Sequence, residues 1–237
     1  MESLFTFTSQ PGRCGYLPDR VWSLRYEIVG QLAPAEYLGR LQDGWRRFGY
    51  SLFRPECPGC RMCRSLRVPV ATFRPDRSQR RAWAAGAGEV RVEVGEPSVT
   101  AEKLDLYDRF HAFQHEAKGW PEHGPQTAAD YVESFVDNPF ATQEWCYYLG
   151  DRLVGVGYVD CLPEGLSAIY FFYDPDERAR SLGTFNVLSI IKRAGELGLP
   201  HVYLGYYVEG CRSLEYKGRF RPNEVLGPDG GWKSFLG

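Results

Sequence analysis

The stretch IYFFYDPDERARSLGTFNVLSII, residues 169–191, decides the fold of the second half of the chain. Its first residues close an apolar segment, Leu166–Tyr173, which predicts a strand at the centre of a sheet. A helix is expected over Gly183–Gly198, where a glycine ends it. Backbone N–H groups at the start of a helix attract anions, and arginines in the preceding loop add positive charge. The residues expected to hold an anion there are Arg178, Arg180, Ser181 and Gly183. The alternative is an ordinary turn before a helix.

The neighbouring segments extend this unit into a sheet. Trp145–Leu149 and Arg152–Asp160 flank a Gly-Asp turn and predict a β-hairpin. His201–Tyr207 predicts a further strand after the helix. This order of hairpin, central strand, loop, helix and strand resembles acetyltransferase-like folds of the GNAT type, in which the loop binds the pyrophosphate of acyl-coenzyme A. The expected fold class is α+β, with a GNAT-like acyltransferase domain built on a mixed β-sheet.

The first third of the chain is expected to form a small unit of its own. Ala33–Gly49 has Pro34 near its start and apolar residues at helical spacing, so a helix is expected there. Ala84–Gly88 reads AAGAG, which is typical of a linker. We therefore divide the chain into a small Cys-rich basic N-terminal domain, residues 1–85, and a GNAT-like domain, residues 86–237.

Positive charge is concentrated in one segment. Residues 40–81 contain eleven Arg, no Lys and three acidic residues, a local balance of +8, whereas the whole chain has a net charge of −2 and the remainder therefore carries −10. A basic lobe on an acidic body predicts local docking of a polyanion. The use of Arg without Lys favours forked contacts to phosphate or carboxylate. The alternative is a solvated basic face.

Three cysteines in the same segment have the spacing of metal ligands. Cys57, Cys60 and Cys63 form C-x2-C-x2-C, and Cys14 is the candidate for a fourth ligand brought in by the fold. Four thiolates suit Zn²⁺ or an iron–sulfur cluster. The alternative is a set of ordinary buried or oxidisable thiols.

The location expected for the chain is the cytoplasm. Seven cysteines, three of them within seven residues, indicate a reducing compartment rather than a disulfide scaffold. No apolar run is long enough to span a membrane, and the N-terminal residues do not read as a signal peptide.

Few titratable residues stand where the ends of strands can meet in a cleft. Asp160 follows a predicted strand, Tyr170 lies in the central strand, and Tyr206 and Lys217 lie near the end of the last strand and beyond it. The alternatives for these residues are a turn acid, a core tyrosine and a surface lysine. Segment 115–123, with a histidine at each end, is expected to be a lid or a plain loop.

Several motifs together resemble one enzyme family. They are CGYLP (14–18), WRRFG (45–49), YSLFRPECPGCRMC (50–63) and FRPDRSQRR (73–81) in the first part, and RSLGTFNVLSII (180–191) with LGLPHVYLGYYVEGCRSLEYKGRFRPNEVL (197–226) in the second. In this order they resemble aminoacyl-tRNA–protein transferases. The compact length and the CGYLP start resemble the bacterial aspartate/glutamate leucyltransferase branch.

The resemblance implies a reaction. Leucine is moved from leucyl-tRNA to the N-terminal amine of a protein that begins with Asp or Glu, which creates an N-degron for protein degradation. The implied partners are leucyl-tRNA and such proteins, with no nucleotide cofactor beyond the aminoacyl-tRNA, no membrane and a monomeric enzyme. Three alternatives stay open: transfer from arginyl-tRNA to the same substrates, a coenzyme A-dependent N-acetyltransferase, and a non-catalytic metal- or cluster-containing RNA-binding sensor.

Under this resemblance each candidate residue acquires a role. The residues expected to contact the polyanionic tRNA are Arg46, Arg47, Arg77, Arg178, Arg180, Ser181 and Gly183. The acidic side chain of the acceptor needs a cation, and the residues expected around it are Arg80, Arg81, Lys217, Tyr206 and Ser78. The attacking α-amine has a pKa of about 8, so a modest proton acceptor suffices. Asp160 and Tyr170 are the candidates for that acceptor.

Overall fold

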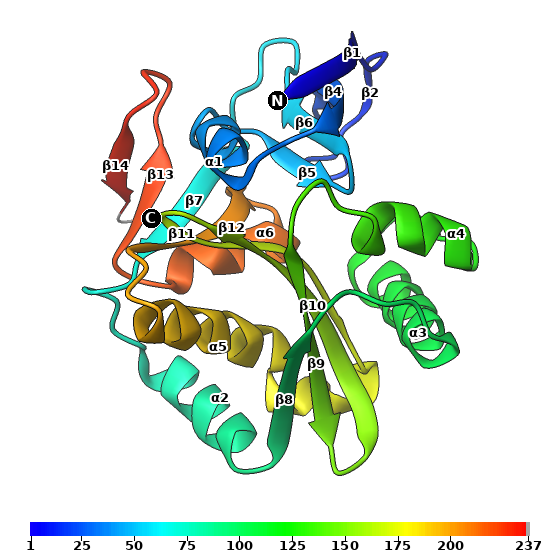
Figure 1. Cartoon of the computed structure of the whole chain (residues 1–237), viewed down its shortest axis with the longest axis vertical. Helices are drawn as coiled ribbons and strands as arrows, with labels where there is room; N and C mark the ends of the chain where they lie inside the picture. Colours follow the sequence, from blue (N-terminus) through cyan, green and yellow to red (C-terminus); the bar gives the residue numbers. More distant parts are fainter. Residues whose placement is uncertain (236–237) are drawn as a thin grey trace.

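The computed structural model describes residues 1–235, which form two main β-sheets (Figure 1). The smaller sheet is antiparallel, and its four strands follow the order β1 (Glu2–Thr8), β4 (Leu24–Gln31), β6 (Ser51–Pro55) and β5 (Arg46–Phe48). A short antiparallel pair lies between β1 and β4 in the sequence, formed by β2 (Gly12–Arg13) and β3 (Val21–Trp22).

The larger sheet is mixed and has eight strands. Their order is β14 (Trp232–Phe235), β13 (Asn223–Leu226), β7 (Arg64–Pro69), β12 (His201–Tyr207), β11 (Gly165–Tyr173), β10 (Arg152–Leu162), β9 (Thr142–Leu149) and β8 (Val90–Gly95). β11 and β12 run parallel, whereas the other neighbouring strands of the sheet are antiparallel. The predicted α+β class with a mixed sheet is therefore confirmed.

Helices cover both faces of the larger sheet (Figure 1). α2 (Arg77–Ala87) and α5 (Leu182–Glu196) lie on one face, and α3 (Ala101–Lys118), α4 (Ala128–Tyr131) and the π-helical turn η1 (Val132–Val136) lie on the other. The strand between them, β10, is buried along almost its whole length because both of its faces are covered. The remaining helical segments are α1 (Pro34–Gln42), η2 (Pro175–Arg180), α6 (Arg212–Glu215) and η3 (Tyr216–Arg219).

The predicted helix over Ala33–Gly49 is wrong in its second half. α1 ends at Gln42, and Gly44 takes a φ of +87°, a left-handed conformation that reverses the chain. Arg46–Phe48 then pairs with β6 as the strand β5. Trp45 continues the apolar spacing of the helix, but its side chain reaches the core from the start of a strand.

The predicted linker at Ala84–Gly88 is also wrong, because these residues form the end of α2 and its cap. Gly86 lies against Phe185 of α5, and a Cβ atom at this position would come within 2.4 Å of the Phe185 ring. The small residues therefore allow two helices to pack closely. β7 pairs with β12 and β13, which places residues 64–69 in the larger sheet although they precede the predicted boundary at residue 85.

A buried ion pair joins the smaller sheet to the larger sheet. Arg47 on β5 and Asp160 on β10 each have 0% of their side-chain surface exposed. Arg47 Nε donates to Asp160 Oδ2 at 3.0 Å, and Nη2 donates to the other carboxylate oxygen. The other N–H groups donate to Gly49 O, Asn138 Oδ1 and Thr142 Oγ1 at 2.7–3.0 Å. All five N–H groups of the guanidinium thus have a partner.

This arrangement corrects two predictions. Arg47 cannot contact a tRNA phosphate, because its side chain is enclosed and its donors are already used. Asp160 cannot accept a proton from a substrate amine, because its carboxylate faces Arg47 and Thr142 in the interior. Both residues hold β5 against β10.

We predict that Asp160→Ala lowers the free energy of unfolding by about 3–5 kcal/mol, because it leaves the buried Arg47 charge without its partner. Chemical denaturation measures the change. Glu196→Ala is the control, since it removes an exposed ion pair with Lys192 and should cost less than about 1 kcal/mol. An Asp160→Ala protein with wild-type stability but no enzymatic activity would return Asp160 to a catalytic role.

Candidate active site

The candidate site lies where β11 and β12 part. The two strands pair only between Gly165–Ser167 and His201–Tyr203. Beyond that point β12 shifts its register against β7, and Gly205 takes a φ of +80°. The smaller sheet reaches this opening through β5, whose Phe48 ring lies 6.0 Å from the ring of Tyr170. Residues of both sheets therefore meet here.

Two cations converge on Gly205. A Cβ atom on this glycine would lie 3.5 Å from Lys217 Nζ and 3.7 Å from Arg46 Nε, so the two nitrogens are at most 7.2 Å apart. Lys217 Nζ donates to the backbone oxygen of Tyr206 at 3.0 Å. The Arg46 guanidinium lies 5.2 Å from the centroid of the Tyr206 ring. The structure thus brings the predicted pair Tyr206 and Lys217 together and adds Arg46 to it.

Neither cation has an anionic partner within the part of the chain that the structure describes. Arg46 is only 7% exposed, and its Nη1 donates to Trp45 O at 2.7 Å. Within residues 1–235, its Nε and Nη2 are buried without a hydrogen-bond partner. Burial lowers the pKa of Lys217 to about 7, and the charge of Arg46 adds to the shift. Two like charges in one enclosed place favour an anionic ligand between them.

Two tyrosines in this part of the molecule are partly exposed. Tyr16 and Tyr216 are 37% and 39% exposed, yet burial against their neighbours raises the pKa of each to about 12. The thiol of Cys63 also raises the pKa of Tyr16, and both residues line the same pocket.

The four predicted cysteine ligands line one pocket, together with Tyr206. They are Cys14, Cys57, Cys60 and Cys63. Burial raises the pKa of the Cys63 thiol to about 12, and the neighbouring thiols, Cys57 first, raise it further. A cation bound among these sulfurs would reverse that effect by stabilising their thiolates.

Backbone groups also point at this cluster. The N–H groups of Tyr16 and Leu17 donate to Cys14 Sγ, and that of Ser23 donates to Cys57 Sγ, each at 3.4 Å. Such donors suit a thiolate, so the chemistry of the four sulfurs fits Zn²⁺ or an iron–sulfur cluster. In the described part of the chain, however, no three Cys, His, Asp or Glu side chains are grouped closely enough to hold a metal ion.

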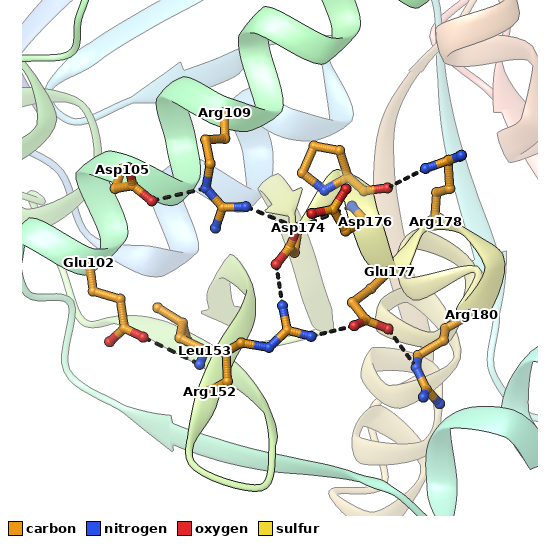
Figure 2. Close-up of polar contacts among 11 residues, drawn as sticks. Glu102, Asp105, Arg109, Arg152, Leu153, Asp174, Asp176, Glu177, Arg178 and Arg180 are labelled. Carbon is orange, nitrogen blue, oxygen red and sulfur yellow. Dashed lines mark hydrogen bonds and ion pairs between the residues drawn. The ribbon is translucent and has the colours of Figure 1, made fainter.

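The loop before α5 is closed by ion pairs, as Figure 2 shows. Asp174 is buried and accepts hydrogen bonds from Arg109 Nη1 at 3.0 Å and from Arg152 Nη1 at 2.5 Å. Arg180 Nε donates to Glu177 Oε2 at 2.7 Å, and its Nη1 donates to Glu89 at 2.5 Å. The charge of Arg180, predicted to hold tRNA, is thus neutralised within the protein.

The other predicted residues of this loop remain accessible. Arg178 is exposed, and its Nη1 donates to Pro175 O at 3.3 Å. Ser181 caps α5 from a left-handed conformation, with a φ of 56°, and Gly183 lies in the first turn of that helix. Their contact with tRNA stays a prediction.

The residues predicted on α2 do not join the cluster around Gly205. Arg77, Arg80 and Arg81 are exposed on the helix surface, and Arg80 Nη1 donates to Pro75 O. Ser78 Oγ donates to the capping carboxylate of Asp76. Across residues 1–235, no hydrogen bond or ion pair links Arg80 or Arg81 to Tyr206 or Lys217.

A buried histidine lies beside Tyr170. His111 Nε2 and Tyr170 Oη are 2.8 Å apart, and His111 is 7% exposed. Burial, helped by the nearby His123, lowers the pKa of His111 to about 4, so its imidazole is neutral at pH 7. The His123 ring stacks on it at 4.7 Å, and Trp120 Nε1 donates to Ser213 Oγ at 2.9 Å. Segment 115–123 therefore lies across the gap between α3 and α6.

His111 is not among the residues predicted from the sequence, and contact of Arg46 with tRNA stays a prediction. His111 follows Tyr107 by four residues, and this helical spacing puts both on the buried face of α3. That spacing is the signal that could have found it. Burial raises the pKa of the Tyr170 hydroxyl well above its ordinary value, so Tyr170 contributes an O–H group rather than an anionic base.

Comparison with known proteins decides the family. The family model described as "Arginine-tRNA-protein transferase, N terminus" matches residues 12–81, and the one described as "Arginine-tRNA-protein transferase, C terminus" matches residues 102–227. The chain belongs to this family. A relative from Helicobacter hepaticus is 36% identical over 94% of this chain and 92% of its own length, and one from Pseudomonas aeruginosa is 38% identical over 93% and 92%. Both are named aspartate/glutamate leucyltransferase, so the predicted branch of this transferase family is confirmed.

The fold of this transferase family member is shared with a solved structure of low sequence similarity. The crystal structure of FemX matches with a TM-score of 0.53 at 9% identity, covering 94% of this chain and 86% of that one. The likeness concerns the fold alone, and it confirms the predicted GNAT-like architecture. None of the helices between residues 1 and 235 is long and apolar enough to cross a membrane.

Proposed function

We propose that this protein transfers leucine from leucyl-tRNA to the N-terminal amine of proteins that begin with Asp or Glu, which marks them for degradation as N-degrons. The observation that carries the proposal is the identity of 36–38% over at least 93% of the chain with relatives named aspartate/glutamate leucyltransferase. The two cations beside Gly205, which have no acidic partner among residues 1–235, support the choice of an acidic acceptor.

The reaction makes modest demands on the protein. The lone pair of the α-amine attacks the ester carbonyl carbon of leucyl-tRNA, an amide forms, and the ribose oxygen leaves with a proton. An α-amine with a pKa of about 8 has a useful neutral fraction at pH 7. Orientation in the opening between β11 and β12 therefore contributes more than a strong base would. The hydrogen-bonded pair of Tyr170 and neutral His111 provides polar groups for the ester and the moving proton.

The smaller sheet offers a platform for the unpaired 3′ end of the tRNA. Residues that pair with one another form a row across one face of this sheet. The row runs from the exposed Phe7 through Tyr26 and Phe53 to the buried Arg46. The Phe7 and Tyr26 rings are stacked at 4.9 Å, and the Tyr26 and Phe53 rings lie 6.2 Å apart. Phe7 is 45% exposed. Bases of single strands stack on such aromatic surfaces, and this row ends at the cluster around Gly205.

The transfer assay tests the function. The protein is incubated with charged leucyl-tRNA and peptides that begin with Asp, Glu or Ala, and leucine is expected on the acidic peptides only. Arginyl-tRNA in place of leucyl-tRNA tests the donor, and acetyl-coenzyme A tests the acetyltransferase alternative. Failure to transfer an amino acid from any charged tRNA would reject the proposal and leave the RNA-binding alternative.

The aromatic row predicts a defect specific to the donor. Phe7→Ala should raise the KM for leucyl-tRNA by about 5-fold or more, because one stacked base contributes about 1 kcal/mol or more. The control is Leu4→Ala, since Leu4 is also exposed but lies at a register shift outside the row. A normal KM for leucyl-tRNA in Phe7→Ala would contradict the placement.

A second part of the proposal concerns the cysteines. We infer that Cys14, Cys57, Cys60 and Cys63 hold Zn²⁺ or an iron–sulfur cluster that keeps their loops in place beside Tyr206. Elemental analysis of protein purified without oxygen should find the metal, and Cys63→Ser should release it. Protein free of Zn and Fe that keeps full stability would contradict the inference. The cytoplasmic location and the monomeric state stay predictions.

A further inference from the structure

We propose that Arg46 and Lys217 form the pocket that reads the side-chain carboxylate of the acceptor's first residue. This inference rests on the proposed function, because it names the residues that choose an acidic acceptor. It moves Arg46 from the set predicted to bind tRNA, and it leaves Arg80 and Arg81 on α2 outside the recognition pocket.

The contrast between two neighbouring arginines carries the first step. Arg46 and Arg47 are adjacent on β5, so they point to opposite faces of the smaller sheet. Every N–H group of Arg47 donates to a protein oxygen. Arg46 is also buried, with 7% of its surface exposed, yet its Nε and Nη2 have no hydrogen-bond partner among the described residues. Buried donors without partners cost free energy, and a ligand that accepts from both would recover it.

Lys217 supplies the second half of the pocket. Its Nζ uses one donor on Tyr206 O and lies on the same side of Gly205 as Arg46 Nε. A carboxylate accepts charge-assisted hydrogen bonds at about 2.8 Å, so its two oxygens can bridge nitrogens up to 7.2 Å apart. Gly205 has no side chain, so no Cβ atom occupies the position that lies 3.5 Å from Lys217 Nζ and 3.7 Å from Arg46 Nε. No acidic side chain among residues 1–235 forms an ion pair with either cation.

Two anions of the reaction share this chemistry: the acceptor carboxylate and a phosphate of the donor. The enclosed position of Arg46 favours the carboxylate, which is small, flat and carried on a slim peptide terminus. The aromatic row leads to Arg46 from the open side and gives the donor a separate path. We therefore assign the pocket to the acceptor.

Peptides that differ by one group test the assignment. The kcat/KM for transfer of leucine to Asp-initial and Asn-initial peptides is measured with the wild-type protein, Lys217→Met and Arg46→Met. The wild type should prefer Asp, and each variant should lose at least about 30-fold of that preference through a higher KM for the Asp peptide. Lys217→Arg should retain part of the preference. The matched controls are Lys192→Met and Arg193→Met, which remove exposed charges from α5.

The outcomes separate the two proposals. A folded Lys217→Met protein with the wild-type preference for Asp over Asn would overturn the pocket, and so would a variant whose only defect is a higher KM for leucyl-tRNA, since that result assigns the cations to a phosphate. If the wild type transfers leucine to no peptide, the proposed function fails. Calorimetric binding of the Asp and Asn peptides to wild type and Lys217→Met then still tests the pocket, because equal affinities would reject it. Since Arg46→Met can disturb β5, Lys217→Met is the deciding variant.

Discussion

The buried contact between Arg47 and Asp160 fixes the geometry on which the site depends. It joins β5 of the smaller sheet to β10 of the larger one, and it uses all five N–H groups of the guanidinium. Losing one partner of such a pair is costly, because the other is left as an uncompensated buried charge. Successive side chains of a strand point to opposite faces. Because Arg47 points toward β10, Arg46 points to the other face of β5, toward Gly205 and Tyr206.

The same alternation gives the smaller sheet two distinct faces. Leu52 and Val29 join Arg47 on the face that packs against α1, whereas Phe53 and Tyr26 join Arg46 on the opposite face. An aromatic path for a nucleic acid end and a cationic pocket for a peptide end can therefore converge at one point. In a GNAT-like fold the loop before α5 would take the anionic donor, but here Glu177 and Glu89 neutralise Arg180 of that loop, whereas Arg178 stays exposed. The aromatic row of the smaller sheet is therefore our proposed surface for the donor.

Regular elements with a single pattern were predictable from the sequence. The hairpin of β9 and β10, the central strand β11, helix α5 and strand β12 all lie where the patterns place them. The errors have physical causes. The apolar spacing of α1 continues past Gly44, although the helix ends at Gln42. The sequence AAGAG is typical of a linker, but its small residues allow close packing against Phe185. The arginine count indicated an anion-binding lobe, but it could not separate Arg46 from Arg47, because adjacent residues on a strand meet entirely different partners.

Selectivity in such a pocket arises from the cost of leaving it empty or wrongly filled. Arg46 and Lys217 repel each other, and burial already lowers the pKa of Lys217 to about 7. An Asp or Glu side chain offsets both effects, because it pairs the unused donors and stabilises the charged lysine. A neutral first residue displaces water from the same place and leaves the cations unpaired, so it is rejected by an unmade interaction rather than by a clash. The preference for acidic N-termini would thus follow from buried hydrogen-bond donors of Arg46 that stay unpaired among the described residues until an acidic acceptor binds.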